Sequence, residues 1–173
     1  MNGAAFNIDA ALPGDAAAVA QIHVDAWRSA YVGIVPDTHL ASLSVDTRTA
    51  MWREAIERGT PQVLVARTDD GLAGWIAFGP TRDEAAAPGS GEVWALYVAP
   101  THWRAGCGRQ LLQRACAGLA ERGHAAAMLW VLVDNADAIR FYEAAGFVAD
   151  AGSDRLFTLA GREIGERRYR HAL

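Results

Sequence analysis

A loop with two glycines, Gly106 and Gly108, carries the first chemical signal in the chain. It follows the apolar run 93–99, which predicts a strand covered on both faces, and Pro100 ends that strand because it has no N–H to donate. A helical pattern begins directly after the loop, and the first N–H groups of a helix lack internal partners at its positive end. With Arg104 and Arg109 beside them, these donors predict a site for a phosphate-bearing ligand.

The loop differs from two common phosphate-binding motifs. A dinucleotide fingerprint needs a third glycine at position 111, where Leu111 stands. A Walker loop needs Gly-Lys-Ser/Thr, and this segment contains no lysine. A domain that binds ATP or NAD is therefore an alternative with weak support. Gly-x-Gly alone is equally consistent with a tight strand-to-helix turn that binds nothing.

A second segment, residues 135–147, follows the apolar run 128–133. In this order and spacing, the two segments resemble the GNAT superfamily of acyl-CoA-dependent N-acetyltransferases. The second segment fits the family pattern Asn-x-x-Ala-x-x-x-Tyr-x-x-x-Gly-Phe at Asn135, Ala138, Tyr142, Gly146 and Phe147. The first fits the pattern Pro…(Gln/Arg)-x-x-Gly-x-Gly/Ala at Pro100, Gly106 and Gly108.

The resemblance implies an acetyl-CoA site, with the pantetheine arm in a gap between two central strands, here residues 91–98 and 126–133. Backbone groups near Leu96 and Val98 would face that arm. Asn135 or Asp137 suits the N-cap of the next helix, and the family role of Asn135 is a polar contact to pantetheine. The loop expected to bind the pyrophosphate comprises Trp103, Arg104, Ala105, Gly106, Cys107, Gly108 and Arg109. Trp103 occupies the Gln/Arg slot of the family, and Arg104 can take over part of its polar role.

Acetyl transfer from a thioester to an amine needs a bound acyl donor, a neutral amine and a proton for the departing thiolate. In the GNAT family a tyrosine of this motif points at the CoA sulfur, and the resemblance assigns that position to Tyr142. A phenol with a pKa of about 10 stays protonated and can donate. The alternative for Tyr142 is a helix tyrosine that only packs against the sheet.

An alkyl amine, with a pKa of roughly 10.4, arrives mostly protonated, so a base is useful. Glu92 is the candidate, directly or through a water. It begins the strand that precedes the glycine loop, and simple alternation places it on the face of Trp94, Leu96 and Val98. The alternative is a solvated glutamate at a strand end, and Asp25, His23 and His102 are rival bases.

An aromatic stripe lies on the first expected helix, where His23, Trp27 and Tyr31 are four positions apart. Such a stripe usually completes the core. The resemblance favours a second interpretation, because the first helices of GNAT-like proteins border the acceptor site. We therefore name Trp27 and Tyr31 as candidate substrate-binding residues.

The elements needed to position these groups follow from periodicity and turn residues. Helices are expected at about 15–30, 45–58, 108–122 and from 135 to 146, with a break at 33–36. Strands are expected at 6–12, 62–67, 72–79, 91–98, 126–133, 147–150, 156–159 and 166–170. The resemblance implies an α/β fold in which about seven mostly antiparallel strands carry helices on both faces and splay between the fourth and fifth strands. Residues 1–173 are expected to form one such domain.

The composition, net charge and cysteine spacing of the chain argue against several classes of function. The chain has 173 residues, of which 51% are apolar, and its formal charge of −4 argues against a nucleic-acid surface. No run is long enough to cross a membrane, and the first residues lack the layout of a secretory signal, so a cytoplasmic protein is expected. Cys107 and Cys116 form neither a zinc nor a disulfide pattern, and no metal is expected. Cys107 is a reactive-thiol candidate by position, but a small apolar filler explains it more simply.

These features together predict a single-domain N-acetyltransferase that uses acetyl-CoA and acetylates a small-molecule or peptide amine in a ternary complex. The alternative is a non-catalytic module that binds or senses acyl-CoA. The sequence leaves the acceptor open, as well as the oligomeric state, with which a homodimer is compatible.

Overall fold

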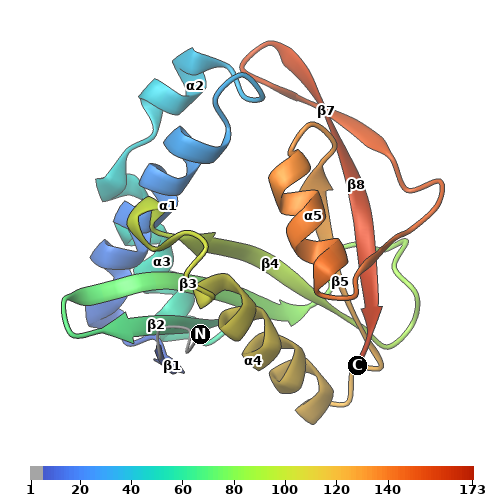
Figure 1. The fold of residues 1–173 in the computed structure, drawn as a ribbon, viewed down its shortest axis with the longest axis horizontal. Coiled ribbons are helices and arrows are strands. Elements are labelled where there is room, and N and C mark those ends of the chain that lie inside the picture. The colour runs from blue at the N-terminus through green and yellow to red at the C-terminus, as the bar shows by residue number, and fades with distance from the viewer. Residues whose placement is uncertain (1–5) are drawn as a thin grey trace.

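The computed structural model describes residues 6–173, which form one eight-stranded sheet with helices on both faces (Figure 1). Its strand order is β1-β2-β3-β4-β5-β8-β6, and β7 pairs with β8. The strands are β1 (Asn7–Ala10), β2 (Gln62–Thr68), β3 (Gly71–Pro80), β4 (Ser90–Val98), β5 (Ala126–Leu132), β6 (Val148–Ala149), β7 (Arg155–Leu159) and β8 (Arg162–Ala172). The expected fold class is confirmed, with one strand more than the seven that the resemblance implies.

The main helices begin and end close to the predicted residues. Ser44 caps α3 by accepting a hydrogen bond from the Thr47 N–H, and Gly59 ends the same helix in a left-handed conformation. The short helix α2 was not predicted, because six residues contain too few turns for an apolar stripe to show. The α-helices are α1 (Ala16–Ala30), α2 (Asp37–Ser42), α3 (Val45–Arg58), α4 (Cys107–Glu121) and α5 (Ala136–Ala144), and the 3-10 turns are η1 (Pro13–Asp15) and η2 (Pro100–His102).

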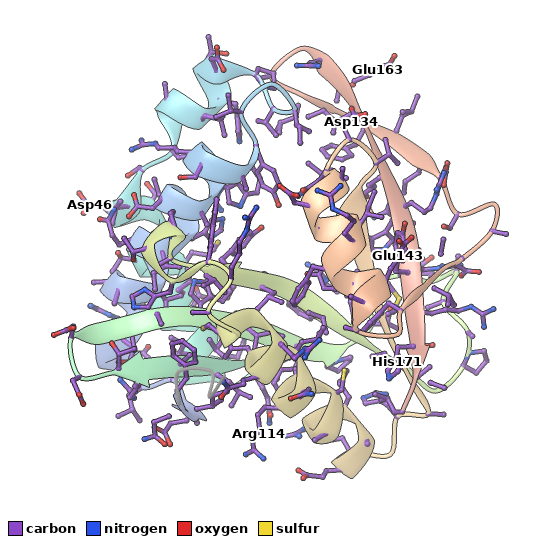
Figure 2. The ribbon with its side chains drawn as sticks, viewed as in Figure 1. Asp46, Arg114, Asp134, Glu143, Glu163 and His171 are labelled. Carbon is purple, nitrogen blue, oxygen red and sulfur yellow. The ribbon has the colours of Figure 1, made fainter. Side chains whose placement is uncertain are left out.

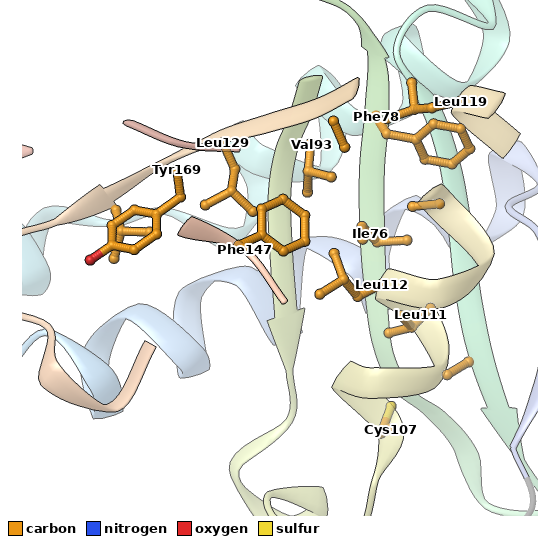
Figure 3. Packing of buried hydrophobic residues seen from close by; sticks show 14 of the residues in the cluster. Ile76, Phe78, Val93, Cys107, Leu111, Leu112, Leu119, Leu129, Phe147 and Tyr169 are labelled. Carbon is orange, nitrogen blue, oxygen red and sulfur yellow. The ribbon is translucent and has the colours of Figure 1, made fainter. Parts of the chain in front are cut away.

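Two apolar clusters hold the layers together. On one face of the sheet, Leu111, Leu112 and Leu119 of α4 pack against β3 and β4 (Figure 3). On the other face, α1 and α3 pack through Val19, Ile22 and Trp52 against β2 and β3. Charged residues of the helices stay outside, as Arg114 on α4 and Glu143 on α5 illustrate (Figure 2). The helices are thus fixed by apolar burial, which positions their ends at the central strands.

The two central parallel strands pair over a short stretch only. Ser90, Gly91 and Glu92 of β4 are in register with Ala126, Ala127 and Met128 of β5. Beyond these residues β4 pairs with β3 alone and β5 with β8 alone. The predicted splay between the fourth and fifth strands is therefore present, and it leaves one edge of β4 without a strand partner.

A hairpin made by β7 and β8 extends the far side of the sheet. β7 pairs with the first half of β8, from Arg155 opposite Glu166 to Leu159 opposite Arg162. The hairpin reaches the segment between α1 and α2, where Arg162 Nη1 donates to the Gly33 carbonyl at 3.2 Å. Ile164 and Leu159 pack there against Val35 and Tyr31. The hairpin and α1 therefore face each other across the splayed strands.

Within the described residues, no helix is long and apolar enough to span a membrane.

Candidate functional site

A cavity of about 1090 Å³ occupies the splay between β4 and β5. It exceeds the ~300–1,000 Å³ typical of a single ligand site, so it has room for a cofactor arm and an acceptor. Of the residues predicted to bind cofactor or substrate or to act in catalysis, Ala105 alone does not line it; of the rival bases, His102 lines it and His23 and Asp25 do not. Those that do are Trp27, Tyr31, Glu92, Leu96, Val98, Trp103, Arg104, Gly106, Cys107, Gly108, Arg109, Asn135 and Tyr142. Sequence segments more than 100 residues apart thus meet at one place.

The glycine loop has the backbone conformation of an anion site. Gly106 is left-handed with φ +88°, and Arg104 is left-handed with φ +62°, which is uncommon for a residue with a side chain. Such strain tends to occur at functional sites. No side chain caps α4, so the N–H groups of Cys107, Gly108 and Arg109 point from the helix start without a partner inside the helix. The arrangement suits the pyrophosphate expected from the sequence.

Trp103, which stands where the family pattern has Gln or Arg, connects the glycine loop to β4. Its indole Nε1 donates to the Val98 carbonyl at 2.8 Å, and the ring itself remains exposed. The bond fixes the loop to the end of β4. Trp103 therefore forms a side wall of the cavity next to the unpaired edge of β4.

Cys107 is a packing residue by its surroundings. Its side chain is buried against β3, where Gly74 leaves it room: a Cβ on Gly74 would lie 3.1 Å from Cys107 Sγ. Burial raises the pKa of the Cys107 thiol to about 11, so the thiol form predominates at neutral pH. These observations favour the apolar-filler interpretation over the reactive-thiol one.

Tyr142 and Asn135 come from α5, on the far side of the loop. The side-chain oxygen of Asn135 accepts from the Ala138 N–H at 3.1 Å, which confirms the predicted N-cap. Tyr142 packs edge to face against Phe141 and Phe147. Burial first, and the neighbouring Tyr97 second, raise the pKa of Tyr142 well above its usual value. Within residues 6–173 the Tyr142 hydroxyl has no hydrogen-bond partner, so it remains free for a ligand.

Glu92 is placed differently from what simple alternation predicts. A β-bulge lies in β4, because Ala77 pairs with Ala95 while Phe78 pairs with Val93. Trp94 is the extra residue, and the strand changes face there. Trp94 packs with the cluster of α1 and α3, whereas Leu96 and Val98 pack with the cluster of α4. The expectation that these three share one face with Glu92 is therefore wrong.

The Glu92 carboxylate is bound by one neighbour. Oε1 accepts from Nε and Nη2 of Arg82, and Oε2 accepts from the Arg82 backbone N–H at 2.7 Å. A carboxylate oxygen has two lone pairs, so Oε2 keeps one site for a water or a ligand. Glu92 is a buried, paired carboxylate and not the solvated strand-end residue of the alternative interpretation.

The aromatic stripe of α1 divides between core and cavity. His23 is buried, accepts at Nδ1 from Trp52 Nε1 at 3.1 Å and stacks on Tyr97. Burial lowers the pKa of His23 to about 3, so it is neutral. Trp27 and Tyr31, in contrast, line the cavity with Tyr97. Burial raises the pKa of both tyrosines, so both are neutral, and the Tyr97 hydroxyl interacts with the Tyr31 hydroxyl and the Trp27 indole N–H.

Sequence reasoning missed several lining residues that surround the expected acceptor end. Tyr97 lies in a uniformly apolar run, and the loop between β3 and β4 contains no recognisable motif. The bulge that turns Trp94 has no clear sequence signal. The missed residues include Arg82, Asp83, Trp94, Tyr97, Trp130, Arg155, Phe157 and Glu166. Among residues 6–173, no group of three or more His, Cys, Asp or Glu side chains is arranged to hold a metal ion.

Comparisons with known proteins give a consistent result. The family model described as "Acetyltransferase (GNAT) family" matches residues 17–147. The Bacillus subtilis protein named "Uncharacterized N-acetyltransferase YuaI" is 32% identical over 149 residues, covering 86% of this chain and 82% of that protein. The yncA structure from Salmonella typhimurium, solved with its cofactor acetyl-CoA, is 26% identical with a TM-score of 0.74, covering 98% of this chain and 94% of that one. The Brucella melitensis ribosomal-protein-alanine N-acetyltransferase shares the fold, with 24% identity, a TM-score of 0.77 and coverage of 96% and 99%.

Proposed function

The chain belongs to the GNAT acetyltransferase family, and we propose that it transfers an acetyl group from acetyl-CoA directly to an amine within a ternary complex. One observation carries the proposal: a glycine loop at a helix start, an unpaired strand edge and a free phenol line the same cavity. A related structure that contains acetyl-CoA supports this choice of donor.

Each part of acetyl-CoA has a group in the cavity that can bind it. The pyrophosphate binds the N–H groups at the start of α4, with Arg104 and Arg109 adding positive charge. Neither arginine forms an ion pair with any residue from 6 to 173, so both are available. The pantetheine arm then follows the unpaired edge of β4 past Leu96 and Val98, with Trp103 at its side. Asn135 contributes a polar contact from the start of α5.

In the reaction, the amine nitrogen attacks the thioester carbonyl, the new C–N bond forms and the C–S bond breaks. The departing thiolate takes the proton of the Tyr142 hydroxyl, which the raised pKa keeps protonated before transfer. The amine gives up its own proton to the Glu92 carboxylate through a water at the open site of Oε2, and Glu92 then releases the proton to solvent. Tyr142 regains its proton from solvent after the products leave.

Release of free CoA thiol in the presence of an amine panel tests this function. We expect acetyl-CoA turnover that depends on the amine and falls on Tyr142→Phe, while CoA binding by calorimetry stays unchanged. The alternative is a sensing module, and it predicts saturable acetyl-CoA binding with no amine-dependent thiol release. Absence of any CoA binding would exclude both.

A further inference from the structure

Two arginine–glutamate pairs of the same design line the cavity. Arg82 in the β3–β4 loop bonds Glu92, and its guanidinium lies 4.3 Å from the centre of the Trp94 ring. Arg155 on β7 bonds Glu166 Oε1 at 2.6 Å, and its guanidinium lies 3.6 Å from the centre of the Trp130 ring. Trp94 and Trp130 stand on the two splayed strands, and all six residues line the cavity. Stacking and ion pairing together fix the plane of each guanidinium.

Each pair presents its positive end to solvent. The side chains of Arg82 and Arg155 are 53% and 51% exposed, whereas those of Glu92 and Glu166 are 3% and 17% exposed. A pair with its anion inside and its cation outside is neutral overall but has a dipole directed outward. The cavity surface at this end is therefore favourable to negative charge.

Donors remain on both guanidiniums after the glutamates are satisfied. Two of the five N–H groups of Arg82 bond Glu92, which leaves three, and one of the five of Arg155 bonds Glu166, which leaves four. At the same end the neutral hydroxyl of Tyr97 interacts with the hydroxyl of Tyr31 and the indole N–H of Trp27, and the Tyr97 O–H remains a donor. Such a surface matches a ligand rich in hydrogen-bond acceptors.

The nearby acid Asp83 does not cancel this preference. It lines the cavity, and although burial opposes the change, hydrogen bonds from Ala85 N–H and Arg168, together with the charges of Arg168 and Arg155, lower its pKa. Its carboxylate, however, is paired with Arg168 at 2.8 Å, and both side chains are largely buried. Arg168 also binds Asp150 at 2.7 Å. The Asp83 carboxylate is therefore already occupied by an ion pair with Arg168 of β8.

We propose that Arg82 and Arg155 bind a carboxylate on the acceptor, so that the acceptor is an amino acid or a similar amine with a carboxylate. This inference rests on the proposed function and adds the acceptor class to it. Guanidinium groups bind carboxylates through paired, charge-assisted hydrogen bonds, and prealigned guanidiniums lose little entropy on binding. The aromatic wall of Trp27, Tyr31 and Phe157 leaves an apolar surface for the acceptor side chain.

Equilibrium binding tests the inference without requiring turnover. The protein saturated with CoA is titrated by calorimetry with each protein amino acid, and the best ligand is then compared with its carboxamide and its decarboxylated amine. We expect the acid to bind at least tenfold more tightly than either analogue. The carboxamide is the stricter comparison, because it keeps the size of the acid and removes its negative charge. A preference for the acid over the carboxamide must therefore arise from that charge.

A variant and a matched control locate the effect. Arg155→Gln should weaken binding of the acid about tenfold or more and leave the decarboxylated amine within twofold. Arg167→Gln is the control, because Arg167 pairs with Asp154 on the same hairpin and does not line the cavity. It should change neither affinity. Circular dichroism and thermal unfolding of both variants report whether each one folds.

The outcomes separate this inference from the function on which it rests. If CoA binds but no amino acid does, or if the amide or amine binds as well as the acid, the carboxylate subsite is wrong and the acetyltransferase proposal stands. Equal losses for acid and amine in Arg155→Gln also overturn the subsite, because a general structural effect then explains them. A failure to bind CoA overturns the proposed function itself.

Discussion

The two ends of the cavity are built in different ways. The donor end consists largely of backbone: the N–H groups at the start of α4, the left-handed turn at Gly106 and the unpaired edge of β4. The acceptor end consists of side chains from α1, the β3–β4 loop, β4, β5, β7 and β8. A backbone site depends on turn geometry, which tolerates side-chain changes such as Trp103. A side-chain site depends on identity, so substitutions can change its ligand while the donor end remains the same.

Tyr142 lies between the two ends, and its removal should have the largest effect. Tyr142→Phe keeps the ring that packs against Phe141 and Phe147 and removes the proton donor. We expect kcat to fall about 100-fold, as is common for loss of a general acid, with the Kd for CoA unchanged. Steady-state kinetics and calorimetry measure the two quantities. A kcat within twofold of the wild type would show that solvent protonates the thiolate.

The stability of the protein should depend on pH through His23, which stacks on Tyr97 at the acceptor end of the cavity. The native pKa of His23 is about 3 and the unfolded value is about 6.5, so the unfolded state binds the extra proton between these values. The stability from keeping His23 neutral is present above pH 6.5 and is lost as the pH falls, by about 1.4 kcal/mol per unit.

His23→Asn retains an acceptor for Trp52 Nε1 and removes this titration. From pH 7 to pH 5 the wild type should lose about 2 kcal/mol more free energy of unfolding than the variant. Urea titrations at several pH values provide the measurement. Parallel pH profiles for the two proteins would contradict the buried neutral histidine.

The backbone character of the donor end can be tested at Gly106. Gly106→Ala meets no atom within 4 Å but forces a residue with a Cβ to adopt φ +88°. The strain is about 1–2 kcal/mol, and its relief should distort the loop and weaken CoA binding roughly tenfold. Gly123→Ala is the matched control, with φ +83° and no atom within 4 Å, at the far end of α4. It should lower stability equally and leave CoA affinity intact; equal CoA affinities in both variants would exclude a loop-specific role.

We expect the smallest effects from replacing two helix N-cap residues, one at the cavity and one away from it. Asn135 and Ser44 each accept a hydrogen bond from the third helical N–H, at 3.1 and 3.2 Å. Replacing either residue with alanine should cost about 1 kcal/mol in unfolding free energy. Asn135 alone lines the cavity, so only Asn135→Ala should raise the KM for acetyl-CoA. A similar KM change in Ser44→Ala would assign the effect to stability.

The same contrast explains what the sequence could and could not predict. The loop at 106–108, the N-cap Asn135 and the strand–helix order were readable because they depend on local residue types and spacing. The face of Glu92 was predicted wrongly, since one bulged residue, Trp94, reverses the alternation. The Arg82 and Arg155 pairs could not be predicted, because sheet topology brings together residues 73 positions apart in the chain.

Calorimetric titration with CoA and with pantetheine tests the central claim most directly. If the start of α4 binds the pyrophosphate, CoA should bind with one-to-one stoichiometry and at least 100-fold more tightly than pantetheine, which lacks the pyrophosphate and the adenosine 3′-phosphate attached to it. Equal affinities for the two ligands, or no saturable binding of CoA, would contradict the account.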